Sequence, residues 1–147
     1  MDELNINTSD IQDLTVLIVD DDKTIRDIIM QNLRGIGFQR FLHAANGVEG
    51  FKQMEKPENN VSLVLCDWDM PLADGLTLLR AIRGNDLYKE TPFIMVTAQQ
   101  TQERLKISQA AKYKVDAYIV KPFQAETLRK KVVQVLFGAK DEQSQSA

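Results

Sequence analysis

Several residues that could carry out phosphate chemistry stand where apolar stretches of this sequence end. Asp20-Asp21-Asp22 ends one stretch, Asp67 and Asp69 follow a second, Thr97 ends a third and Lys121 a fourth. Carboxylates without His or Cys ligands suit a hard cation such as Mg²⁺, which leaves coordination sites open for phosphate oxygens. An ammonium and a hydroxyl can bind phosphoryl oxygens beside it. In that setting a carboxylate can attack phosphorus as a nucleophile and form an aspartyl-phosphate.

Each of these residues also has a simple structural alternative. Lys121 would suit a solvated rim, Thr97 could cap a helix, and the Asp triplet could cap a helix over residues 23–36. Asp67 alone could open a turn. The chemical interpretation is favoured because all of these residues fall at the ends of predicted strands.

The elements that would position these residues alternate along the chain. Apolar stretches predict five strands, at 15–19, 38–45 (the weakest), 61–66, 93–97 and 117–120. Apolar residues at helical spacing predict five helices between and after them, the first over 23–36 and the fourth over about 101–113. This order predicts an α/β fold with a doubly wound parallel sheet. Right-handed crossovers would bring the carboxyl ends of all strands to one edge, where such sheets bind ligands.

The composition is that of one globular domain and argues against several functions. The 147 residues are 44% hydrophobic and 27% charged, with a net charge of −3, which gives no general attraction to nucleic acid or to acidic membranes. The single cysteine, Cys66, excludes an internal disulfide, and the single histidine, His43, makes a zinc site unfavourable. No stretch resembles a signal peptide or a membrane span, so we expect a cytoplasmic protein.

Four stretches of the chain resemble the motifs of one family, the response regulator receiver domains, and especially its single-domain chemotaxis members. They read VLIVDDD at 16–22, DWDMP with a following DG at 67–75, MVTA at 95–98, and YIVKPF at 118–123. The resemblance spans residues 16–137 and implies a flavodoxin-like sheet with strand order 2-1-3-4-5 flanked by five helices.

The resemblance also implies a role for each residue at the predicted edge. Asp67 would accept a phosphoryl group from a phosphohistidine on a sensor histidine kinase or phosphotransfer protein. Mg²⁺ would be held by Asp20, Asp21, Asp67 and the main-chain carbonyl of Asp69. The residues that would bind phosphoryl oxygens are Thr97 and Lys121. On activation Tyr118 would swing inward together with Thr97, and the Lys121-Pro122 peptide bond would be cis.

The sequence departs from this family at two places. Asp69 stands where the chemotaxis members carry Asn, and Gln99 stands where they carry an acid; both positions are expected to tune the lifetime of the phosphoryl group. Tyr113-Lys114 replaces a small Ala-Gly pair. Lys114 is therefore expected in a left-handed conformation, at a cost of about 1 kcal/mol.

These observations predict a flexible N-terminal arm over 1–14, a receiver domain over 15–137 and a polar C-terminal tail over 138–147. The expected function is a single-domain response regulator that signals by phosphorylation-dependent protein binding, with a flagellar motor switch as one candidate target; it would not be a classical enzyme. An alternative is a receiver that serves as a phosphate sink or relay intermediate. A third reading, a small aspartyl-phosphate phosphatase, is disfavoured because Pro71 stands where that family needs Thr or Val and because the chain has no room for a cap.

Overall fold

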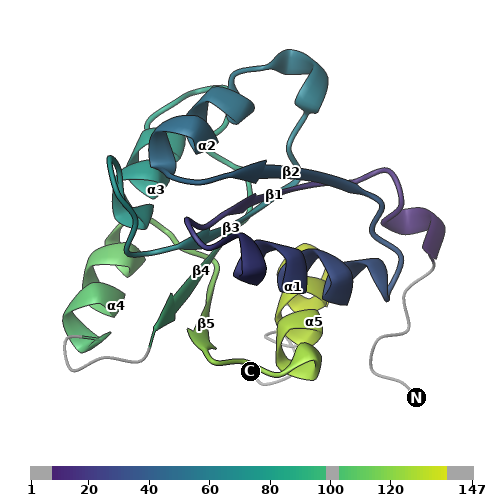
Figure 1. Cartoon of the computed structure of the whole chain (residues 1–147). Helices are drawn as coiled ribbons and strands as arrows, with labels where there is room; N and C mark the ends of the chain where they lie inside the picture. Colours follow the sequence, from purple (N-terminus) through teal and green to yellow (C-terminus); the bar gives the residue numbers. More distant parts are fainter. Residues whose placement is uncertain (1–7, 99–102, 139–147) are drawn as a thin grey trace, which may run out of the picture.

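The computed structural model describes residues 8–98 and 103–138, in which strands and helices alternate (Figure 1). The five strands are β1 (Thr15–Val19), β2 (Arg40–Ala44), β3 (Leu63–Asp67), β4 (Phe93–Ala98) and β5 (Ala117–Lys121). The α-helices are α1 (Lys23–Arg34), α2 (Gly47–Met54), α3 (Gly75–Arg83), α4 (Glu103–Lys112) and α5 (Ala125–Val133). Short 3₁₀ turns lie at Thr8–Asp10 and Pro57–Asn59, and a π-helical turn, Gln134–Gly138, follows α5.

All strand pairs are parallel, and the sheet has the order β2-β1-β3-β4-β5. This confirms the predicted doubly wound fold and its strand order. The weakly predicted second strand exists but is shorter than expected, and as the edge strand it is only partly buried. An edge strand has a neighbour on one side only, which explains its mixed sequence.

Alternating residues of the central strands form two cores, one on each face of the sheet. Val16, Ile18 and Leu65 pack with α1 and α5, whereas Leu17 and Val64 pack with α2, α3 and α4. Strands covered on both faces read as continuous apolar runs, which is why these stretches are so hydrophobic. Cys66 is a buried member of the second core, as expected. Within the described ranges no helix is both long and apolar enough to span a bilayer.

Three polar side chains act as N-caps of helices that start near the carboxyl edge of the sheet. The carboxylate of Asp22 accepts a hydrogen bond from Thr24 N, and Asp74 accepts one from Thr77 N. Asn46 does the same for Glu49 N in α2. Such caps satisfy backbone donors that the first helical turn leaves open. They fix where each helix starts relative to the sheet edge.

The N-terminal arm is in part packed against the domain. Within the described residues of this segment, Ile11 is only 2% exposed and belongs to the core between the sheet, α1 and α5. The Leu14 backbone N–H donates to the Ile11 carbonyl at 3.1 Å, which closes the turn that leads into β1. Residues 8–14 therefore differ from the flexible arm expected there. Ile11 and Leu14 are too few in this polar stretch to show a period, so the sequence pattern did not reveal their packing.

The turn at Lys114 has the left-handed backbone expected from the sequence. Lys114 has φ of 63°, the left-handed conformation expected from its place in a position suited to Gly. The guanidinium of Arg83 donates to the Lys114 carbonyl at 2.9 and 3.3 Å and to Asp116 Oδ2 at 3.2 Å. Asp116 Oδ2 in turn accepts from the backbone N–H of Phe93. Arg83 thus holds the turn before β5 in a conformation that Lys114 would not adopt by preference.

Lys114→Gly is expected to raise the free energy of unfolding by about 1 kcal/mol, because Gly adopts a positive φ without the Cβ clash. Urea denaturation of the two proteins measures the difference. The matched control is Lys130→Gly in the body of α5, where Gly should instead lower stability by about 1 kcal/mol. A loss of stability in Lys114→Gly would show that the lysine side chain contributes more than its backbone strain costs.

Candidate functional site

Residues from four strands meet at the carboxyl edge of the sheet. Asp20 follows β1 directly, Asp67 ends β3, Thr97 lies in β4 and Lys121 ends β5. The parallel register pairs Asp67 with Val96 and Ala98 with Lys121, so these strands reach the edge at nearly the same level. The topology therefore brings together the side chains that the sequence placed at the strand ends.

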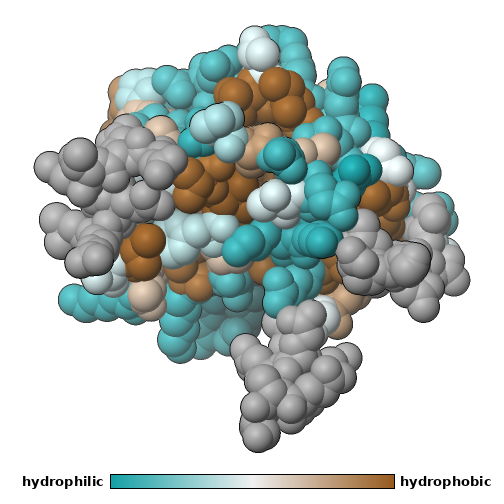
Figure 2. All heavy atoms as spheres, turned by 90° about the horizontal axis from the view of Figure 1, so that it is seen from below, coloured by the Kyte–Doolittle hydropathy of each residue, from teal (hydrophilic) through white to brown (hydrophobic). Residues whose placement is uncertain are grey.

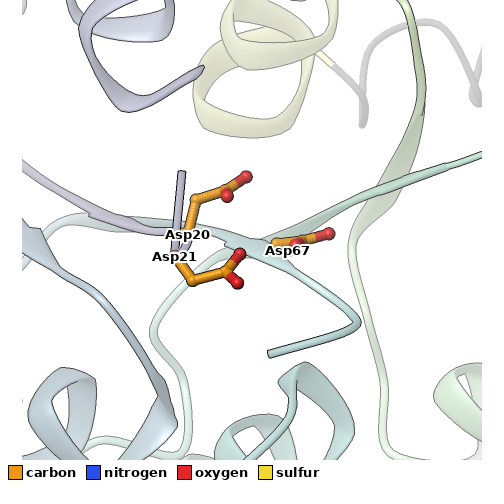
Figure 3. A group of neighbouring side chains, drawn as sticks. All are labelled: Asp20, Asp21 and Asp67. Carbon is orange, nitrogen blue, oxygen red and sulfur yellow. The ribbon is translucent and has the colours of Figure 1, made fainter. Parts of the chain in front are cut away.

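Three of the acidic side chains form one compact cluster. Asp20, Asp21 and Asp67 each offer a carboxylate oxygen, and these oxygens lie within 4.8 Å of one another (Figure 3). Asp20 and Asp67 are buried, being 2% and 8% exposed, whereas Asp21 faces solvent. Carboxylates this close repel one another strongly when water is excluded. The cluster is therefore unfavourable unless positive charge is close by.

Lys121 supplies positive charge at the cluster. Its Nζ lies 2.9 Å from Asp20 Oδ2 and 3.4 Å from Asp67 Oδ1, so one ammonium bridges the two buried carboxylates. Burial by itself lowers the pKa of Lys121, but the hydrogen bond to Asp20 and the charges of both carboxylates outweigh it, and the pKa is raised. Lys121 is thus fully charged at neutral pH.

The position of Asp67 favours the protonated form of its carboxyl group. Burial and then the charge of Asp20 raise the pKa of Asp67 to about 6, against the opposing effect of Lys121. A bound cation would favour the ionised form and lower this pKa. Asp67 therefore combines a high basicity with a position at the centre of the site, which suits a nucleophile.

The backbone around Asp67 is tightly enclosed. A Cβ added to Gly75 would overlap the Asp67 carbonyl oxygen and would lie 2.8 Å from Met95 Sδ. The Gly75 N–H donates to the Trp68 carbonyl at 2.8 Å. Only glycine fits at this close approach, so the start of α3 is locked against the end of β3. Gly75→Ala is incompatible with this arrangement of the loop.

Of the remaining predicted residues, Thr97 and Asp69 lie at or just beyond the same edge, Tyr118 lies near the start of β5, and Gln99 is not described. Thr97 is buried, and its hydroxyl donates to the Ala98 carbonyl over a long 3.5 Å. Tyr118, in β5, donates from its hydroxyl to the Ile107 carbonyl of α4 at 3.1 Å, and burial raises the pKa of Tyr118 to about 12. Asp69 is exposed in the loop after β3. Gln99 lies outside the described residues.

Arg26, in α1, is a contact of the site that the sequence analysis did not identify. Its guanidinium donates to the main-chain carbonyl of Asp20 and, at 3.3 Å, to Nδ1 of His43. Arg26 follows the Asp triplet by one helical turn, which offered a weak signal. Its partner His43 lies on the weakly predicted second strand, and no sequence signal indicated that contact. The Lys121-Pro122 peptide bond is cis, as the resemblance implied.

The donor set of the cluster fits a hard divalent cation. Only oxygen ligands are present in it, two of them are already buried, and the ammonium of Lys121 offsets part of their charge. Mg²⁺ characteristically binds to one or two carboxylates and keeps several waters. The arrangement of Asp20, Asp21 and Asp67 can therefore hold such an ion and, through Lys121, an anionic group beside it.

Comparison with known proteins gives one consistent result. Residues 16–133 match the family model described as response regulator receiver domain. Chemotaxis protein CheY1 of Helicobacter pylori is 34% identical over 128 residues, which cover 87% of this chain and all of that protein. Chemotaxis protein CheY-3 of Vibrio cholerae is 37% identical over 121 residues, covering 82% of this chain and 90% of that protein. The solved structure of chemotaxis response regulator CheY4 of Vibrio cholerae superposes with a TM-score of 0.74 at 31% identity, over 84% of this chain and 98% of that one.

Proposed function

Because the chain belongs to the response regulator receiver domain family, a family of signalling proteins rather than classical enzymes, we propose that it is a single-domain regulator phosphorylated on Asp67. The observation that carries this proposal is the position of Lys121, whose ammonium contacts both Asp20 and Asp67 in a buried acidic cluster. A stability role alone would be better served by apolar side chains, because burying charges is costly even when they are paired.

In the proposed reaction an Asp67 carboxylate oxygen attacks the phosphorus of a phosphohistidine. The new O–P bond forms while the P–N bond breaks, and the electron pair stays on the imidazole nitrogen of the donor. Asp20, Asp21, Asp67 and the Asp69 carbonyl would hold Mg²⁺, whose charge would compensate for the negative charge on the phosphoryl oxygens. Lys121 would move its hydrogen bond from Asp67 to a phosphoryl oxygen. The reaction thus needs little beyond positioning and charge compensation.

We propose Thr97 and Tyr118 as the two-state element that reports phosphorylation. Within the described residues the Thr97 hydroxyl donates one long hydrogen bond, of 3.5 Å, so a phosphoryl oxygen would offer it a stronger, charge-assisted one. Movement of Thr97 toward Asp67 would leave space that the Tyr118 ring fills, at the loss of its bond to Ile107. A ligand that binds one state better shifts the equilibrium toward that state.

Thr97→Ala is expected to accept a phosphoryl group yet lose the phosphorylation-dependent gain in partner affinity. Phosphorylation should change the partner affinity of this variant by less than about threefold, because the charge-assisted hydrogen bond that favours the active state is absent. Partner binding with and without phosphodonor measures this, and Thr97→Ser, which keeps the hydroxyl, is the control. Unchanged partner affinity in phosphorylated Thr97→Ala would remove Thr97 from the switch.

The partners follow from the same proposal. The family implies a histidine kinase as the phosphoryl source, and the names of the relatives favour chemotaxis, with a flagellar motor switch protein as the target. The output surface would be formed by α4, β5 and α5, which Figure 1 places on the lower side of the molecule. Seen from below, hydrophobic residues lie exposed among hydrophilic ones on this side of the molecule (Figure 2). A phosphate sink or relay intermediate would show no such phosphorylation-dependent binding.

Trp68 offers a direct test of the proposed reaction. Its indole is buried and adjoins Asp67 in the chain, so its fluorescence should respond first to Mg²⁺ and then to acetyl phosphate. Asp67→Asn should lack the second response. No response of the wild type to either addition would leave the cluster without the proposed chemistry.

A further inference from the structure

The β1–α1 turn that carries Asp20 and Asp21 is held by contacts on every polar group of Asp20. The Asp20 N–H donates to the Ala44 carbonyl at 3.0 Å. Its Oδ1 accepts from the Asp22 N–H, and its Oδ2 accepts from Lys121 Nζ, both at 2.9 Å. Its carbonyl oxygen accepts from the guanidinium of Arg26. The first three contacts involve the neighbouring strand, the turn itself and the ion pair, in that order. The fourth comes from Arg26 in the first turn of α1.

The guanidinium of Arg26 is itself oriented by a second contact. Its Nε donates to Nδ1 of His43 at 3.3 Å, so His43 accepts this bond as a neutral imidazole with its proton on Nε2. Burial first, and then the charge of Arg26, lower the pKa of His43, in agreement with the neutral form. The His43 carbonyl also accepts, at a long 3.5 Å, from Gln53 of α2. Arg26 is thus anchored to the edge strand β2.

Charge alone does not explain an arginine at this place. A guanidinium close to a cation site repels the cation, so its electrostatic effect on Mg²⁺ binding is unfavourable. Its bond to a main-chain carbonyl, in contrast, limits how far the β1–α1 turn can rotate. Outer contacts of this kind orient the ligands of a metal and are worth about tenfold to a hundredfold in affinity.

We propose that Arg26, oriented by His43, is a positioning residue that fixes the β1–α1 turn so that the carboxylates of Asp20 and Asp21 face Asp67 for cation binding. This inference rests on the proposed Mg²⁺ site and adds a residue of α1 and one of β2 to it. It gives the edge strand a direct connection to the ligands, through Arg26 and the Asp20 carbonyl.

The test is a Mg²⁺ titration of the full chain, followed by Trp68 fluorescence and by calorimetry, with no phosphodonor present. Arg26→Gln should bind Mg²⁺ roughly tenfold more weakly than the wild type, because the turn loses its anchor. The matched control is Lys23→Gln, which removes one positive charge from the same helical turn, where the ammonium of Lys23 pairs with Asp27 at the helix surface. It should bind Mg²⁺ equally or slightly more tightly. Arg26→Lys keeps a positive charge but cannot contact the Asp20 carbonyl and His43 in the way a guanidinium does. Its loss of Mg²⁺-binding free energy should therefore be more than half of the loss in Arg26→Gln.

A positioning role predicts that Arg26→Gln weakens Mg²⁺ binding, whereas charge repulsion alone predicts that it strengthens binding. Affinity of Arg26→Gln equal to or tighter than that of the wild type would overturn the positioning role and leave only charge repulsion. If Arg26→Gln does not fold, His43→Leu decides, since it leaves the guanidinium in place but removes its acceptor. His43→Leu should weaken Mg²⁺ binding about threefold, as a part of the outer-contact effect; unchanged affinity would overturn the proposal. Failure of the wild type to bind Mg²⁺ would instead contradict the proposed function.

Discussion

Lys121→Met is expected to lower the free energy of unfolding by about 3–5 kcal/mol in Mg²⁺-free buffer, because it leaves two buried carboxylates without their cation. The ammonium contacts Asp20 at 2.9 Å and Asp67 at 3.4 Å, and Asp20 is 2% exposed. Methionine has a similar length and removes the ammonium, with its charge and its hydrogen bond to Asp20. Chemical denaturation at pH 7.5 measures the loss.

Mg²⁺ should restore part of this stability, and more of it in Lys121→Met than in the wild type, because the ion neutralises the same carboxylates. The control is Lys23→Met, whose ammonium pairs with Asp27 in solvent and should change stability by less than about 1 kcal/mol. A small effect of Lys121→Met without Mg²⁺ would mean that the carboxylates are not ionised together in the folded protein.

Asp67→Asn is expected to raise the free energy of unfolding at pH 7.5 without Mg²⁺, by up to about 3 kcal/mol. The pKa of Asp67 is raised from 3.8 to about 6, and each unit corresponds to about 1.4 kcal/mol. The folded state therefore holds the proton more tightly than the unfolded state, so ionisation of Asp67 weakens the fold. Asparagine removes the charge and keeps the shape.

The stability advantage of Asp67→Asn over the wild type depends on pH, because the pKa of Asp67 is higher in the folded state than in the unfolded state. Well below pH 3.8 Asp67 is protonated in both the folded and the unfolded state, and the variant has no advantage. The advantage grows between pH 3.8 and about 6 and is constant above. Denaturation curves at several pH values measure it, with Asp86→Asn, at an exposed carboxylate, as a control that should stay within about 0.5 kcal/mol. An advantage that shrinks as the pH rises would contradict the raised pKa.

The sequence allowed the central part of the fold and site to be predicted because each depends on local pattern. The apolar runs around Leu17, Leu65 and Ile94 are long enough to read as doubly covered strands, and parallel topology then fixes where their ends meet. Asp20, Asp67, Thr97 and Lys121 could be brought together on this ground alone, although they lie far apart in the chain.

The contacts that the sequence did not reveal depend on pairs of residues without a shared period. Arg26 reaches His43 across an edge strand whose own pattern is weak, and Arg83 reaches Lys114 over 31 residues. Ile11 is one of a few irregularly spaced apolar residues in a mainly polar segment. Such contacts arise only from the packing of finished elements, so periodicity carries no trace of them.

The most direct test of phosphorylation on Asp67 is the intact mass of the protein after incubation with acetyl phosphate. The wild type with Mg²⁺ should gain the mass of one phosphoryl group, and chelation of the ion should abolish the gain. Asp67→Asn should gain nothing, whereas Asp69→Asn, which alters the neighbouring exposed carboxylate, should still be modified. No added mass on the wild type, or an equal gain in Asp67→Asn, would contradict the assignment of Asp67 as the phosphoryl acceptor.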